Sequence, residues 1–211
     1  MRSVVISSCY TIDLLEHRPL NIVQFPHPTL RRINKPLRRV DRKIKTLVAE
    51  MFELMYAAKG IGLAANQVDL PFRLFIINPA GERGSGDEYV LINPVIDSPK
   101  GREVAEEGCL SLPGLYRQIA RPDQIHVAAY DLSGNAIDMH VDGLLARVIQ
   151  HEFDHLQGVL FVDRLDDGDV KSVEDDLRAF ESEFLSYRAA GRIENDEAIE
   201  QRLKELETEY C

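Results

Sequence analysis

Cysteine and long apolar runs are both scarce in the chain, and each shortage excludes a class of protein. The 211 residues include three cysteines, Cys9, Cys109 and Cys211, whose odd number and wide spacing do not suit a disulfide framework. The longest apolar runs span four or five residues, far short of the roughly 20 that cross a bilayer. The first 20 residues also lack the apolar core of a secretory signal. We therefore expect no membrane partner and a reducing compartment, cytoplasmic as in bacteria, with an organellar location as the alternative.

The net charge of −10 is unevenly distributed along the chain. Residues 166–211 contain 15 acidic and 6 basic residues, whereas residues 1–165 contain 20 and 19. A nearly neutral body is thus followed by an acidic tail, and this balance gives no reason to expect DNA as a partner. Residues 31–45 hold eight Lys and Arg residues against one Asp. We interpret this basic stretch as a solvated surface, with a face for RNA as the alternative.

The hydrophobic pattern predicts an α+β fold with antiparallel sheet. Apolar residues at helical spacing predict a helix over 41–59, capped by Asp41 and closed by Gly60. A second helix is expected over 142–157, with Asp142 as a candidate cap and Gly158 just past its end. Strands are expected at four segments: 72–78, 89–96, 125–130 and 136–141. Because strands and helices do not alternate regularly, a doubly wound parallel fold is disfavoured.

The acidic tail has its own helical pattern. Apolar residues recur there at intervals of three and four: Val170, Val173, Leu177, Phe180, Phe184 and Tyr187. A second group follows Gly191: Ile199, Leu203, Leu206 and Tyr210. We interpret both groups as helices packed on the protein's own body, and a homodimer that buries the same seam is the alternative.

The segment with the most side chains able to bind a metal or transfer a proton, residues 150–158, reads QHEFDHLQG. Four residues advance a helix by about 400°, so His151 and His155 lie on one face and can reach one metal ion. Glu152 lies beside that face, where the general base of HExxH metalloenzymes stands. Taken alone, the segment also fits a surface helix with two unrelated histidines.

A catalytic metal site needs a third protein ligand and one open position. The position of the third histidine of metzincins is occupied by Phe161, so that ligand is missing. Upstream, residues 107–111 read EGCLS, and Cys109 is the only cysteine away from the chain ends. A lone cysteine is often a small buried apolar residue, but beside two helical histidines Cys109 is the best candidate for the third ligand.

A third segment, residues 60–67, reads GIGLAANQ. It lacks the last glycine of a dinucleotide loop and the lysine of a phosphate loop, which makes nucleotide binding a poor interpretation. Its small residues permit close approach of another backbone or a ligand. Gln67 offers an amide donor that could stabilise negative charge on a carbonyl oxygen, although tight packing alone would also explain the segment.

Together the three segments resemble the motifs of peptide deformylases, GxGxAAxQ, EGCLS and QHExDHLxG, in order and without substitution. The resemblance covers residues 20–165. It implies an N-terminal extension over 1–19, a catalytic domain over 20–165 and an acidic helical extension over 166–211. The implied fold has antiparallel β-sheets packed around a central helix that bears the HExxH motif.

The resemblance also implies an activity and the residues that perform it. Deformylases remove the N-formyl group from the N-terminal methionine of newly synthesised proteins and release formate. The implied metal ligands are Cys109, His151 and His155. Glu152 would be the general acid and base, while Gln67 and the backbone N–H of Leu110 would polarise the formyl oxygen. The family favours Fe²⁺, and the same ligands would accept Zn²⁺, Ni²⁺ or Co²⁺.

The substrates implied are N-formylmethionyl nascent peptides, whose methionine needs an apolar slot. We predict that Ile61, Leu144 and Val148 line the slot and that Gly60 and Gly62 border it. In some bacterial relatives a basic C-terminal helix docks on ribosomal RNA. The acidic tail here cannot use phosphate attraction, so a transient ribosome contact would fall on residues 31–45. Two other functions are compatible with these residues: a zinc endopeptidase, and a binding module that has lost turnover.

Overall fold

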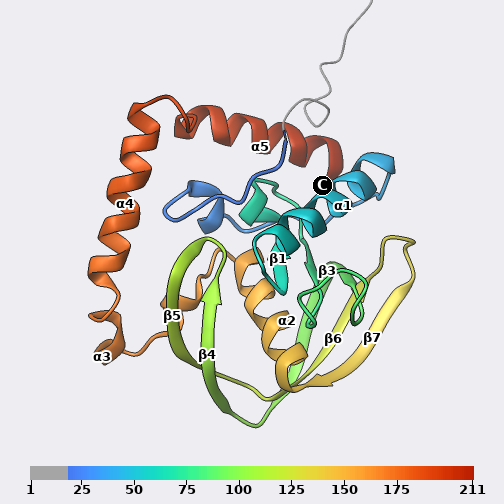
Figure 1. The fold of residues 1–211 in the computed structure, drawn as a ribbon. Helices are drawn as coiled ribbons and strands as arrows, with labels where there is room; N and C mark the ends of the chain where they lie inside the picture. Colours follow the sequence, from blue (N-terminus) through green and yellow to red (C-terminus); the bar gives the residue numbers. More distant parts are fainter. Residues whose placement is uncertain (1–18) are drawn as a thin grey trace, which may run out of the picture.

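The computed structural model describes residues 19–211, so all but one residue of the predicted N-terminal extension, and Cys9 with it, lie outside the described part (Figure 1). Five strands form an antiparallel sheet in the order β1-β2-β3-β6-β7, and β4 pairs with β5 in a separate hairpin. The strands are β1 Gly62–Ala64, β2 Leu74–Ile77, β3 Tyr89–Lys100, β4 Glu103–Cys109, β5 Leu112–Arg121, β6 Gln124–Tyr130 and β7 Ala136–Asp142. The predicted α+β class with antiparallel sheets is confirmed.

The β6–β7 hairpin lies where the sequence predicts it. Asp131 closes the turn, because its Oδ1 accepts hydrogen bonds from the N–H groups of Ser133 and Asn135. Alternate residues of β6 are buried and face helix α2: Ile125, Val127 and Ala129. The sheet therefore presents one apolar face to the helix that carries the histidines.

Helix α1, Arg42–Ala57, begins as predicted, because Asp41 accepts hydrogen bonds from the N–H groups of Lys43 and Ile44. Its end differs in detail from the prediction. Lys59, not Gly60, takes the left-handed conformation at φ 57°, while the Gly60 N–H bonds the Met55 carbonyl at 2.9 Å. This hydrogen-bonding pattern is a Schellman motif. Its left-handed position, where glycine is usual, is occupied by Lys59, and Gly60 is the next residue.

Helix α2, Gly143–Leu156, lies between the five-stranded sheet and the β4–β5 hairpin (Figure 1). Asp142 stands at its N-cap position, but its side chain makes no capping hydrogen bond there. Gly158 follows the helix at φ 73°, and a Cβ at this position would lie 2.6 Å from the Arg31 carbonyl oxygen. Only glycine fits this turn, which brings the end of α2 against the N-terminal part of the body.

The tail forms three helices, α3 Asp167–Val170, α4 Glu174–Ala189 and α5 Asp196–Tyr210. In Figure 1, α4 runs along the left side of the body and α5 along the top. The apolar residues of α5 are buried, and Leu206 and Tyr210 join the core beneath α1. Val173 and Phe184 are also buried, whereas Val170 lies in α3 and is exposed. The tail therefore packs on its own body, as predicted.

Three arginines of the basic stretch, residues 31–45, pair with carboxylates. Arg32 pairs with Glu200 and with Glu207, the latter at 2.8 Å, and Arg39 pairs with Glu209 at 3.2 Å. Arg31 pairs with Asp163 in the body. The interpretation of these arginines as a solvated surface was therefore incomplete, because carboxylates of the acidic tail pair with Arg32 and Arg39. None of the helices in residues 19–211 has the length and apolar character needed to cross a membrane.

Candidate active site

Three predicted ligands converge where the end of β4 meets the middle of α2. The Cys109 Sγ lies 3.3 Å from the His155 Nε2, and the Nε2 atoms of His155 and His151 are 3.2 Å apart. Metal bonds of about 2.0–2.1 Å to nitrogen and 2.3 Å to sulfur place neighbouring ligands of a tetrahedral ion roughly 3.3–3.6 Å apart. The spacing therefore fits one divalent cation, and in the described part of the chain this is the group of side chains that could hold one.

The protonation of the two histidines bears on this fit. Burial lowers the pKa of His155 well below its usual value, so this ring is neutral and its nitrogen lone pair is available. For His151 burial acts in the same direction, but contacts with Cys109 and Glu107 outweigh it and raise the pKa to about 10. A cation at this site would compete with a proton for His151.

Glu152 lies beside the ligands with its carboxylate against Gly62 of β1. A Cβ at position 62 would stand 2.4 Å from the Glu152 Oε1, so the carboxylate occupies the space that any side chain there would need. Burial raises the pKa of Glu152 to about 7. Its Oε2 has no hydrogen-bond partner among residues 19–211. Such a carboxyl group can take up and release a proton near neutral pH.

Gln67 is held in a fixed orientation by the short helix η2, Ala65–Val68. Its Oε1 accepts a hydrogen bond from the Ala64 N–H at 2.8 Å, which turns the amide nitrogen towards the ligands. That Nε2 lies 3.2 Å from the Ser111 Oγ and 3.4 Å from the Cys109 Sγ. The side chain therefore offers a donor beside the metal ligands, and Ser111, to which we assigned no role, helps to position it.

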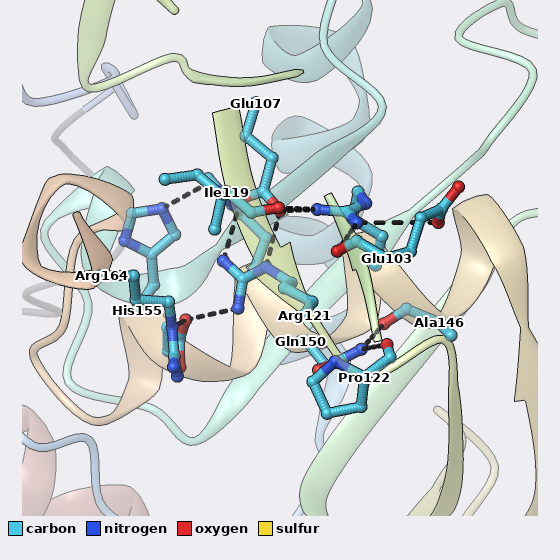
Figure 2. Close-up of polar contacts among 12 residues, drawn as sticks. Glu103, Glu107, Ile119, Arg121, Pro122, Ala146, Gln150, His155 and Arg164 are labelled. Carbon is cyan, nitrogen blue, oxygen red and sulfur yellow. Dashed lines mark hydrogen bonds and ion pairs between the residues drawn. The ribbon is translucent and has the colours of Figure 1, made fainter. Parts of the chain in front are cut away.

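A buried cluster of charged residues supports His151, and the sequence interpretation missed it. Glu107 accepts hydrogen bonds from the Arg121 Nε at 2.6 Å and from Arg147 at 2.7 Å. Its other oxygen lies 3.1 Å from the His151 Nδ1. Figure 2 shows Arg121 below Glu107, with the dashed contacts between them. This contact fixes the imidazole ring so that Nε2 faces the other ligands.

The cluster continues on the far side of Arg121, whose NH1 donates to Asp154 at 2.7 Å, and Asp154 also pairs with Arg164. Burial opposes ionisation of Glu107, but hydrogen bonds from His151 and Arg121 lower its pKa to about 2. One signal in the sequence was available: Arg147 stands one helical turn before His151 in an otherwise apolar stretch, where a charge needs a buried partner.

A cavity of about 690 Å³ opens onto these groups. Its lining includes every residue assigned to the site except His155: Gly60, Ile61, Gly62, Gln67, Cys109, Leu110, Leu144, Val148, His151 and Glu152. His155 is buried behind the other ligands. Leu144 lies at the mouth with 54% of its surface exposed, whereas Val148 is buried further in. The structure thus brings the three motif segments to one cavity with mixed apolar and polar walls.

The family model for polypeptide deformylase matches residues 19–171. The chain belongs to the peptide deformylase family. It is accordingly an enzyme of this class, and deformylases depend on a metal. The match to the family model ends before α4, so helices α4 and α5 lie outside the matched residues.

Similar deformylases are found in bacteria and plants. The chain is 47% identical over 192 residues to the peptide deformylase of Rhodopirellula baltica, with 91% of this chain and 96% of that protein covered. It is 45% identical to the chloroplastic peptide deformylase 1B of Oryza sativa, with 82% and 64% covered. The crystal structure of Arabidopsis thaliana deformylase 1B with an inhibitor superposes at a TM-score of 0.77, at 41% identity and with 85% and 99% covered.

Proposed function

We propose that this deformylase removes the N-formyl group from the N-terminal methionine of newly synthesised proteins and releases formate. The observation that carries the proposal is the meeting of Cys109, His151 and His155 with Glu152 at one cavity. Membership of the deformylase family supports the same reaction. The roles of the individual residues below are part of the proposal.

Each residue of the site has a separate proposed role in hydrolysis of the formyl group. A bound divalent cation would act as a Lewis acid and lower the pKa of water at the site. Glu152 takes the proton from the attacking water, holds it on its carboxylate, and delivers it to the nitrogen of the leaving amine. The Gln67 Nε2 and the Leu110 backbone N–H donate to the formyl oxygen as negative charge develops on it. Because Gln67 is already oriented by Ala64, this stabilisation needs little rearrangement during the reaction.

The methionine side chain is proposed to occupy the apolar part of the cavity formed by Ile61, Leu144 and Val148. All three line the cavity together with the backbone of Gly60 and Gly62. The two glycines allow close packing at this wall, since a Cβ at Gly60 would meet the Leu110 side chain at 2.7 Å and one at Gly62 would meet the Glu152 carboxylate. Burial of a methionine side chain supplies about 1.5–3 kcal/mol of binding free energy.

For the metal, we propose Fe²⁺ as the physiological ion, with Zn²⁺, Ni²⁺ and Co²⁺ able to take its place. One thiolate and two imidazoles suit each of these ions, so the ligand set alone does not select among them. Iron is favoured by the family resemblance. A ferrous site with a thiolate ligand is expected to lose activity in air, which gives a direct way to identify it.

We further propose three functional parts: an extension over 1–19, a catalytic domain over 20–165 and a helical tail over 166–211. We keep a cytoplasmic location as the proposal and an organelle as the alternative, because relatives from bacteria and from chloroplasts both match the chain. A ribosome contact through the basic stretch, residues 31–45, loses support, because carboxylates of the tail and body already pair with Arg31, Arg32 and Arg39.

The deciding experiment measures hydrolysis of formyl-Met-Ala by protein purified without oxygen, with metal analysis of the same sample. We expect release of formate in proportion to bound metal and no cleavage of an internally cleavable peptide. Cleavage of that peptide instead would favour the zinc endopeptidase. Stoichiometric metal without turnover on either substrate would favour a binding module.

A further inference from the structure

A second groove lies next to the active-site cavity, between residues 21–27 and helix α4 of the tail. Its volume is about 260 Å³. Aromatic side chains of α4 form one wall: Phe180, Phe184 and Tyr187. The opposite wall includes Ile22, Gln24 and Phe25. None of the residues assigned to the active site lines this groove, and α4 lies beyond the part matched by the family model.

The groove borders the active-site cavity, because Ile22 and Gln24 line both of them. The segment that carries these residues is attached to the active site on its other side. The Val23 N–H donates to the Gln67 carbonyl at 2.8 Å, and the Phe25 N–H donates to the Ser111 carbonyl at 2.9 Å. Residues 21–25 therefore form a wall shared by the catalytic cavity and the groove.

The aromatic wall is held in place before any ligand arrives. The Tyr187 hydroxyl donates to the Glu183 Oε1 at 2.6 Å, and the Arg192 guanidinium lies over the Tyr187 ring at 5.2 Å. The Phe184 ring meets His27 edge-on, with centroids 6.2 Å apart. Rigid aromatic surfaces bind apolar side chains with little loss of conformational entropy, while Glu183 and Arg192 leave the rim polar.

We propose that this groove is a downstream subsite of the deformylase, which takes an apolar side chain of the nascent peptide several residues after the formyl-methionine. The proposal rests on the proposed function. Only a peptide whose formylated N-terminus is bound in the active-site cavity would extend past Ile22 and Gln24. It assigns to the acidic tail a part in substrate selection. Short formyl dipeptides do not reach the groove, whereas longer chains do.

The test compares kcat/KM of the metal-loaded enzyme for formyl-Met-Ala and for formyl peptides of up to eight residues, which extend over about 27 Å. A single leucine is placed at successive positions in an otherwise Ala and Ser sequence. We expect kcat/KM to rise by about tenfold when leucine reaches the groove, the effect of burying one apolar side chain. The Tyr187→Ala variant should lose this gain and keep its dipeptide activity within about twofold.

Two further variants separate recognition from folding. Leu185 lies on the same helix, is 63% exposed and does not line the groove, so Leu185→Ala should keep both the gain and the dipeptide activity. Glu183→Lys reverses the charge of an exposed rim residue and also removes the acceptor of the Tyr187 hydroxyl. It should lower the preference for a lysine over a glutamate next to the leucine by about threefold.

A rate independent of peptide length, or an equal loss on short and long peptides in Tyr187→Ala, would overturn the subsite and leave the proposed function intact. Absence of activity on formyl-Met-Ala in the unaltered enzyme would overturn both.

Discussion

Arginine–carboxylate pairs stabilise two regions of this deformylase, the surroundings of the metal ligands and the contact between the acidic tail and the body. Near the ligands the pairs are buried: the side chains of Arg121 and Glu107 are 2% and 6% exposed. In the tail contact, those of Arg39 and Glu209 are 53% and 39% exposed. Water screens the second kind of pair but not the first, so loss of one partner should have very different consequences in the two regions.

The largest effect is expected in the buried region, at Glu152, the carboxyl group to which we assign the proton transfer. Glu152→Gln keeps the shape of the side chain but cannot accept a proton, so kcat on formyl-Met-Ala should fall by about 10²–10⁴-fold. Metal content and thermal stability should stay at the level of the unaltered enzyme. A variant that retains more than about a tenth of the activity would show that Glu152 is not the base.

Removal of a buried arginine should come next. Arg121→Met leaves the carboxylates of Glu107 and Asp154 without their shared partner, and the free energy of unfolding should fall by about 3–5 kcal/mol. Urea denaturation measures this change. The matched exposed variant, Arg39→Met, should lose less than about 1 kcal/mol. Equal losses in the two variants would remove the distinction between the regions.

The buried region should also give the enzyme a marked sensitivity to acid. The pKa of Glu107 is about 2 in the folded chain, below its ordinary 4.5, so its stabilising effect is complete above about pH 5 and declines as the pH falls towards 2. This decline amounts to about 2 kcal/mol between pH 7 and pH 3. In chelator-treated protein, the free energy of unfolding of Glu107→Gln should fall between pH 7 and pH 3 by less than that of the unaltered chain, and the difference should be about that amount. Parallel curves for the variant and the unaltered chain would contradict the assignment.

An intermediate effect is expected where the tail reaches towards the active site. Arg202 of α5 donates to the Asp69 Oδ2 at 2.6 Å, and Asp69 follows the short helix η2 that carries Gln67. Arg202→Ala should lower the free energy of unfolding by about 1–3 kcal/mol, because it removes a partner from a buried carboxylate. The melting temperature and kcat should both be lower than in the unaltered enzyme. Unaltered kcat with lowered stability would mean that the tail does not position Gln67.

The smallest effect is expected on the outer face of α4. Arg178 pairs with Glu174 one helical turn away, and both side chains are largely exposed. Arg178→Ala should therefore change the free energy of unfolding by less than about 0.5 kcal/mol, which calorimetry would resolve only as a small shift. A loss above about 1 kcal/mol would show that exposed pairs of the tail act as a network.

The meeting of Cys109, His151 and His155 could be predicted from the sequence, whereas the buried contacts of Arg121 could not. His151 and His155 share a helix, so their spacing alone places them together, and Cys109 is the one cysteine away from the ends. Arg121 gave no such sign, because it lies in a strand segment with mixed polarity and resembles an ordinary surface arginine. Its burial depends on Glu107 and Asp154, which come from two other elements.

A similar limit applies to the two charged segments. The opposite charges of residues 31–45 and of the tail were visible, but a charge count does not say which carboxylate meets which arginine. The pairs of Arg32 with Glu200 and Glu207 depend on where α5 docks, and its buried face decides that position. The helix end near Lys59 differs for a local reason, since several arrangements can close a helix before Gly60.

The contact between Gly62 and Glu152 limits how this enzyme could escape an inhibitor. Resistance commonly arises when a substitution narrows a binding site without harming the reaction. At position 62 every side chain would collide with the Glu152 carboxylate, so a mutant that obstructs a drug there would also displace the group that we propose as the base. A compound that contacts the backbone at Gly62 would therefore bind at a position where few resistance substitutions are compatible with activity.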